Sequence, residues 1–450
     1  MAATPAWPAS PPTPHAPPMP PTPALPSASG EPMDSPLHAR RAIEALRAGV
    51  PNRDAVRALG SAQPQAEEEF WRRLQGAGDD FARGVQTPGL LVAGDFGAGK
   101  SHLLAYLQHL ALQQNFVCST VVISKETPLY DPAKLYRAAL EGAAVPGHTG
   151  AALAEIAENL RSAGPRFQEF SRWAHDPQSG LNSRFPATVF LYERVNDAEV
   201  LDRIVSLWSG DPLNVSELRK WLRAHDAAAT YRLERITAKE LAVQRFAFAA
   251  RLIAAAGYAG WVLLVDEVEL IGRYSFMQRA RSYASLARWA GLLDGEACPG
   301  LVAVFAITSD FAAAVLEDRN DAEAVPGKLR ASGLDPERLL AAQAERGMRF
   351  IAREALHLRA PDRQTIERTR EEVRALHGRA YQWHPPPAES GSDLTLRMRQ
   401  HVREWINEWD LRRVDPTYRP QFVVSDLAVD YSERPDLETP PEGETDRSSE

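Results

Sequence analysis

The chain has 450 residues, of which 44% are hydrophobic and 24% charged, so it holds enough apolar material for a large core and is not a wholly disordered protein. Its formal net charge is −8. Most of that charge lies in residues 1–36 and 431–450, so residues 37–430 are nearly neutral and net charge excludes no class of partner.

Two classes of protein are excluded by what the sequence lacks. With only two cysteines, Cys118 and Cys298, the chain has neither a disulfide framework nor a zinc–cysteine cluster, and we expect both thiols in the core. It has no apolar run of about 18 residues and no secretory signal. We therefore expect a cytoplasmic protein without a membrane span.

The N-terminal half of the chain begins with a proline-rich leader. Residues 1–36 contain thirteen prolines without apolar periodicity, which predicts a disordered segment. Helical spacing then predicts three short helices, at 38–47, 52–59 and 65–74. The apolar run at 90–93 predicts a buried strand, and a helix at 102–114 and a strand at 116–123 follow. This β-α-β order predicts a parallel sheet with helices on both faces.

Between the first strand and its helix, the sequence fits the phosphate-loop pattern G-x-x-x-x-G-K-[ST] at every fixed position. The matching residues are Gly94, Asp95, Phe96, Gly97, Ala98, Gly99, Lys100 and Ser101. Glycines let successive N–H groups point at an anion, and the following helix directs its N-terminal dipole there. We expect Lys100 to reach the ATP phosphates, Ser101 to bind Mg²⁺, and His102 to lie beside the nucleotide. Only six lysines occur in the chain, which makes the one at this position informative.

A second acidic motif ends the next predicted strand. Residues 124–260 are almost wholly helical in pattern, and the strand at 261–265 then leads into Asp266 and Glu267. The carboxyl end of a buried parallel strand lies in the crevice where ligands bind. We expect Asp266 to hold Mg²⁺ and Glu267 to deprotonate the attacking water. Capping of the next helix is the alternative for this pair, and Glu269 is a less suitable base.

Polar residues also follow the strand predicted at 301–307. Either Thr308 or Ser309 would position the water near the γ-phosphate, as a catalytic residue of the sensor type. The rival interpretation is an N-cap for a helix at 311–316. No Asn-Lys-x-Asp motif is present, which disfavours GTP, and the acidic pair argues against a small-molecule kinase. ATP hydrolysis is therefore favoured.

Arginines leave more alternatives open. Four lie where an arginine could complete the site of a neighbouring subunit: Arg279, Arg281, Arg319 and Arg330. Helices are predicted at 336–358, 361–377 and 394–409, and on the last of them Arg399 and Arg403 would reach the nucleotide from a lid. Residues 345–379 hold nine arginines and six acidic residues, a weak indication of nucleic-acid binding. Residues 431–450 predict a disordered acidic tail.

Four segments carry a resemblance to a known family: HARRAIEALRAGVP (38–51), GDFGAGKSHLL, LLVDEVELIGRY and RMRQHVREWINEWDLRR. The motifs are similar to those of AAA+ P-loop ATPases. More specifically, residues 37–425 resemble the BrxD family of ATP-binding proteins from BREX bacteriophage-defence systems, which is related to the larger ATPase BrxC. The resemblance implies work with other BREX system proteins, among them a helicase-like protein and a DNA methyltransferase. It also implies an adenine contact at Gly49-Val50-Pro51.

The expected fold is α/β, with a P-loop NTPase (AAA+-like) core and a parallel five-stranded sheet. We expect the ATPase domain at 37–360, with a helical insertion at about 125–258, and a lid or winged-helix-like module at 361–430. The expected function is Mg²⁺-dependent ATP hydrolysis by an oligomer that acts on DNA or DNA-bound partners. The alternative is a module that binds ATP to set an assembly state and scarcely hydrolyses it.

Overall fold

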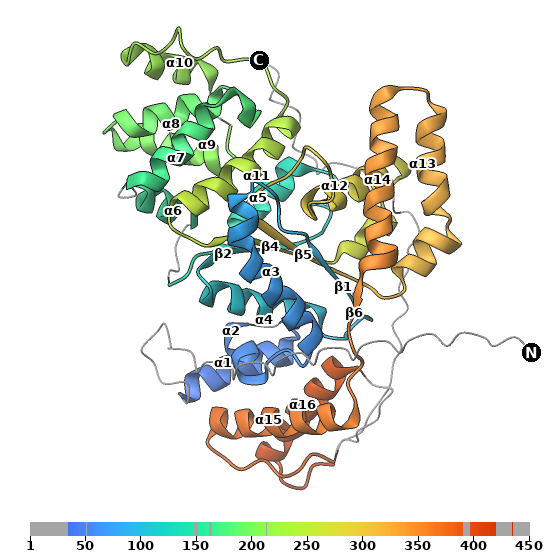
Figure 1. Ribbon diagram of the computed structural model, residues 1–450. Helices are drawn as coiled ribbons and strands as arrows, with labels where there is room; N and C mark the ends of the chain where they lie inside the picture. The colour runs from blue at the N-terminus through green and yellow to red at the C-terminus, as the bar shows by residue number, and fades with distance from the viewer. Residues whose placement is uncertain are drawn as a thin grey trace, which may run out of the picture.

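A six-stranded sheet lies at the centre of the molecule (Figure 1). The computed structural model describes residues 35–50, 52–147, 152–161, 164–212, 214–389, 397–419 and 434. The predicted leader and acidic tail therefore fall outside the described residues, apart from Ser35, Pro36 and Arg434.

The strands are β1 (Leu90–Ala93), β2 (Phe116–Val122), β3 (Ala143–Ala144), β4 (Gly260–Asp266), β5 (Leu301–Ile307) and β6 (Leu356–His357). They lie in the order β3-β2-β4-β5-β1-β6, and all neighbours pair in parallel except β2 and β3. The prediction of a mixed α/β fold around a mostly parallel sheet is confirmed. The predicted number of five strands is wrong, because β3 adds an antiparallel edge strand.

The two edge strands were not recognisable by periodicity. Each has two residues, and its extended conformation depends on pairing with a neighbouring strand: Ala144 with Cys118, and Leu356 with Val92. The helix predicted at 336–358 ends instead at Glu354, because Ala355 is already extended. Pairing, and not local sequence, therefore decides both edges.

Helices cover both faces of the sheet. One face packs on α3 (Pro64–Ala82) and α4 (Lys100–Gln113), and the other on α5 (Pro132–Glu141), α11 (Ala238–Ala255), α12 (Phe276–Trp289) and α14 (Asp335–Glu354). Side chains alternate along β4, so Val262 and Leu264 face α3 and α4 while Leu263 and Val265 face the opposite layer. Both cysteines are buried in these cores, as predicted.

The chain between β2 and β4 forms a helical region on one side of the sheet, coloured cyan to yellow-green in Figure 1. Besides α5 and α11 it contains α6 (Ala152–Arg161), α7 (Gly164–His175), the 3₁₀ turn η1 (Pro177–Ser179), α8 (Arg184–Arg194), α9 (Ala198–Ser209) and α10 (Val215–Ala224). Trp208 is fully buried among these helices, and its indole N–H donates to Thr188 Oγ1 at 3.0 Å. The helical pattern predicted for 124–260 is confirmed for most of this region; besides β3, the exceptions include the irregular stretches 124–131 and 225–237.

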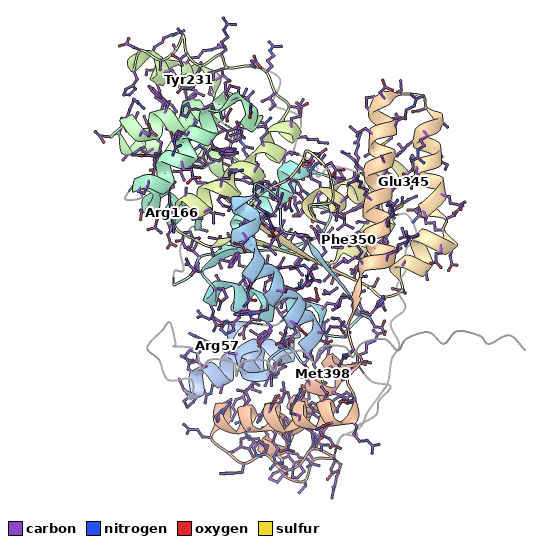
Figure 2. All side chains as sticks on the ribbon, in the orientation of Figure 1. Arg57, Arg166, Tyr231, Glu345, Phe350 and Met398 are labelled. Carbon is purple, nitrogen blue, oxygen red and sulfur yellow. The ribbon has the colours of Figure 1, made fainter. Side chains whose placement is uncertain are left out.

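After β4 the chain forms the 3₁₀ helix η2 (Val268–Arg273) and α12, and after β5 the π-helix η3 (Ala312–Asp318), α13 (Asp321–Ala331) and α14. Helices α13 and α14 form a hairpin that projects beside the sheet (Figure 1). Figure 2 labels Phe350 on α14, whose ring lies 6.4 Å from that of Phe305 on β5. The hairpin therefore packs against the sheet through helix α14.

Gly347 permits the closest approach between α12 and α14. A Cβ atom there would lie 2.0 Å from the backbone oxygen of Tyr283. We expect Gly347→Ala to lower the free energy of unfolding by about 3 kcal/mol or more, since the two backbones must separate. Gly327→Ala on α13 is the matched control, because a Cβ atom at that position would meet nothing within 4 Å and alanine favours a helix. Denaturant unfolding measures both, and equal stability of the two variants would contradict the packing argument.

Four helices from the two ends of the described chain share a third hydrophobic core, and we call them the terminal module. They are α1 (Pro36–Ala48), α2 (Arg53–Leu59), α15 (Arg363–Tyr381) and α16 (Met398–Val414). Their shared core includes Ile43, Ile366, Trp405 and Trp409. Helices α1 and α2 therefore pack against the C-terminal helices (Figure 1), and α2 also packs against α4.

The C-terminal part of this module contains helices only. In 361–389 and 397–419 the structure has α15 and α16 and no strand, so the described residues contain no wing of the kind that a winged-helix module has. Among the described helices, none is long and apolar enough to span a bilayer.

Candidate nucleotide site

The phosphate loop connects β1 to α4, which begins at Lys100. Gly97 and Gly99 have φ values of 83° and 96°, a region that favours glycine. A Cβ atom at Gly97 would also lie 3.0 Å from Cδ of Arg397. Gly97 therefore requires glycine for both conformation and space, and Gly99 requires it for conformation.

Ser101 and Asp266 meet at the carboxyl ends of β1 and β4. The Ser101 hydroxyl donates to Asp266 Oδ2 at 2.6 Å, although the residues are 165 positions apart in sequence. A hydroxyl and a carboxylate are oxygen ligands of the kind that Mg²⁺ prefers. The structure thus brings together the two residues predicted to bind the metal.

Glu267 follows Asp266 in a conformation that is unusual for a side-chain-bearing residue. Its φ is 60°, in the left-handed region, and its N–H donates to Asp266 Oδ1 at 2.9 Å. Strained backbone of this kind is concentrated at functional sites. Burial, followed by the neighbouring Asp266 carboxylate, raises the pKa of Glu267, while Lys100, Arg399 and Arg273 oppose the rise. A raised pKa makes Glu267 a stronger base than an exposed glutamate.

Lys100 is buried and has partners from the loop and from η2. Its ammonium donates to Gly94 O at 3.0 Å and lies 3.6 Å from Glu269 Oε1. Lys100 and Glu269 are each 6% exposed. The sequence named Glu269 only as a less suitable base; the structure places it next to the phosphate-loop lysine instead.

The two predicted sensor residues are arranged differently. The Ser309 hydroxyl donates a hydrogen bond to Asp95 Oδ1 of the phosphate loop, whereas Thr308 is buried at the end of β5. The N-cap position of the following helix is Phe311, which makes no side-chain capping bond. Ser309 is therefore in direct hydrogen-bond contact with the phosphate loop.

A cavity of about 630 Å³ opens between the phosphate loop and the terminal module. This volume lies within the usual range for small-molecule sites. Its walls include Gly97, Ala98, Gly99 and Ser101, Leu46 on α1, and Met398 and Val402 on α16; Figure 2 labels Met398 at this boundary. Lys100 is not among the lining residues. The cavity also has charged walls, among them Glu67, Arg359 and Arg399, so it places both apolar and charged side chains next to the anion-binding loop.

Some residues predicted to contact the nucleotide line this cavity and others do not. His102 does, and its Nε2 lies 2.6 Å from Gly60 O; burial lowers the pKa of the imidazole. Of Gly49-Val50-Pro51, only Gly49 is among the lining residues; Val50 is 66% exposed, and Pro51 lies outside the described residues.

The C-terminal helix contributes arginines to the site. Arg399 lines the cavity beside Gly49, whereas Arg403 is not among the lining residues. The Arg397 guanidinium lies over the Phe96 ring, 5.7 Å from its centre. Arg397 was not recognised from the sequence, because nothing in either segment indicates that they meet.

The four arginines considered for contact with a neighbouring subunit differ in how deeply they are buried. Arg279 is buried and paired with Asp321 at 2.8 Å, so it cannot reach a neighbouring subunit without breaking this pair. Arg319 donates to Gly272 O at 2.5 Å. Arg330 is exposed and pairs with Glu345, and Arg281 is exposed on α12.

The residues present fit a Mg²⁺–nucleotide complex better than a protein-only metal site. Among the described residues, no three His, Cys, Asp or Glu side chains gather where they could hold a metal. Two oxygen ligands from Ser101 and Asp266, next to an anion-binding loop, suit a cation that shares its coordination with phosphates and water.

Comparison with known proteins was made on the whole chain. A family model described as BREX system ATP-binding protein BrxC/D matches residues 35–167 and 196–384, well over half of the sequence. Neither a curated protein nor a solved structure matches the chain. The matched residues include the phosphate loop, the acidic pair and strand β5. The chain therefore belongs to the family of BREX system ATP-binding proteins BrxC/D.

Proposed function

We propose that this protein is an AAA+-like ATPase that hydrolyses ATP with Mg²⁺ in the cytoplasm, as part of a BREX defence system. One observation carries the proposal: residues from three separate segments meet at a single phosphate loop. They are Lys100, Ser101, Asp266, Glu267 and Ser309.

Each of these side chains has a chemical task that follows from its position. Lys100 and the loop N–H groups would bind the phosphates and lower the negative charge that develops on them. Ser101 and Asp266 would hold Mg²⁺, which polarises phosphate oxygens when bound. Glu267 would orient a water molecule and accept its proton, and Ser309, held against Asp95, would keep that water in place.

Hydrolysis by an oligomer is part of the proposal. An arginine from a neighbouring subunit would stabilise the charge of the transition state, and Arg281 and Arg330 are exposed where a neighbour could be reached. Family membership supports work with other BREX components, and we propose a helicase-like protein and a DNA methyltransferase as partners.

DNA binding is supported by how charge is divided over the fold. The described residues of 35–60 and 359–419, which contain the terminal module, hold 17 arginines and 11 acidic residues, whereas residues 61–358 hold 32 basic and 36 acidic residues. On the module, the guanidinium groups of exposed Arg40 and Arg413 lie 5.7 and 4.5 Å from the centre of the Tyr381 ring. Arginines grouped around an aromatic ring suit nucleic-acid phosphates and bases.

The test measures steady-state phosphate release per subunit over a range of protein concentrations, with and without duplex DNA. We expect Mg²⁺-dependent release that rises with concentration, because neighbouring subunits complete the site, and rises again with DNA. Nucleotide binding without release under any condition would contradict the ATPase proposal and favour the assembly module. Arg40→Glu/Arg413→Glu is expected to lose the DNA effect and keep the DNA-free rate; an unchanged DNA effect would contradict the module as the DNA contact.

A further inference from the structure

The Lys100 ammonium already has oxygen partners within the protein. On the protein side are the Glu269 carboxylate at 3.6 Å and the Gly94 carbonyl at 3.0 Å. On the other side, under the proposed function, are the phosphates of a bound nucleotide. An ammonium group has three donors, and it cannot approach two anions equally closely when both compete for the same position.

Glu269 is placed to be an effective competitor. It is 6% exposed, and neither of its carboxylate oxygens accepts a hydrogen bond from another described residue. A buried carboxylate so poorly compensated is strongly attracted to the nearest cation. Burial raises the pKa of Glu269, and the Lys100 ammonium is the first group that opposes this rise, so the two side chains interact electrostatically.

The location of Glu269 separates it from the catalytic carboxylate. Glu267 is half-buried and precedes η2, whereas Glu269 lies within η2, between the core residues Val268 and Ile271. Its backbone is therefore held by the packing of η2 against the sheet. Glu269 can thus act on Lys100 from a fixed position while Glu267 acts on water.

We propose that Glu269 is a positioning residue that competes with nucleotide phosphates for Lys100 and thereby weakens nucleotide binding and speeds the release of ADP. The inference rests on the proposed nucleotide site. It predicts that removing the Glu269 charge tightens binding, which is the opposite of what damage to a binding site does.

The experiment measures the affinity and dissociation rate of a fluorescent ADP analogue, MANT-ADP, on the full chain. Glu269→Gln removes the charge and keeps the shape. We expect its Kd for the analogue to fall by about 5-fold or more, with the change mainly in a slower dissociation rate, as for a coupling of ordinary size. Glu269→Asp, which keeps the charge, is expected to stay closer to the parent protein.

Glu267→Gln is the matched control, because it removes a second carboxylate near the phosphates that forms no ion pair with Lys100. Equal tightening in both glutamine variants would show a general effect of charge and overturn the competition. Unchanged or weaker binding in Glu269→Gln would overturn it as well, and a thermal unfolding curve of each variant confirms that it is folded. If the parent chain does not bind MANT-ADP or ATP, it is the proposed function that fails.

Discussion

Glu267→Gln is expected to lower steady-state ATP turnover by about 10²- to 10⁴-fold, the usual contribution of a general base. The substitution preserves the shape of the side chain and removes its ability to accept a proton. The left-handed backbone at Glu267 and its N–H bond to Asp266 do not depend on the carboxylate, so the local structure should persist.

Nucleotide binding is expected to survive this change, and this separates the base from the binding residues. The measurement pairs phosphate release with a binding titration on the same preparation. Glu234→Gln, an exposed glutamate of the helical region, is the control and should match the parent protein. Turnover of Glu267→Gln at the parental rate would contradict the assignment of Glu267 as the base.

Lys100→Ala is expected to weaken ATP binding by at least about 30-fold and to abolish measurable turnover. Removing one partner of a buried charged contact costs about 2–5 kcal/mol, which corresponds to this change in Kd or a larger one. Lys100 is 6% exposed at the start of α4, where no other described lysine lies in the loop to replace it. Titration calorimetry with ATP and Mg²⁺ measures the effect.

Two further variants make the Lys100 result interpretable. Lys100→Ala leaves the buried Glu269 carboxylate without its ion pair, which could lower stability by itself. The double variant Lys100→Ala/Glu269→Gln removes both charges and is expected to fold normally and still fail to bind ATP. Lys239→Ala, on the exposed start of α11, should bind as the parent does. ATP binding by the double variant with parental affinity would rule out the proposed site.

The central strands of the fold were predictable because their signals are local and long enough to recognise. Strands β1, β2, β4 and β5 are apolar runs of four to seven residues, and both faces of each are covered by helices. The edge strands β3 and β6 have two residues each, and only their pairing with a neighbour makes them extended. The local sequence does not indicate that pairing.

In the candidate site, too, some features were predictable from local sequence and others depended on the tertiary structure. Residues 94–101 were identified from consecutive positions, since glycines, a lysine and a hydroxyl at fixed spacing already specify an anion-binding turn. The hydrogen bond between Ser309 and Asp95 depends on where the end of β5 lies relative to the phosphate loop. The exclusion of Arg279 depended on its buried pair with Asp321.

By itself, then, the sequence determined the phosphate loop, the acidic pair and the α/β class, because each is encoded in one short stretch of chain. Only the tertiary structure decided that Glu269 faces Lys100, that Arg397 reaches the loop, and that α1 and α2 share a core with α15 and α16. These contacts join segments far apart in the chain, and the free energy that forms them comes from burying apolar surface in a shared core. Periodicity reports which face of an element is apolar, but it does not report which other element covers that face.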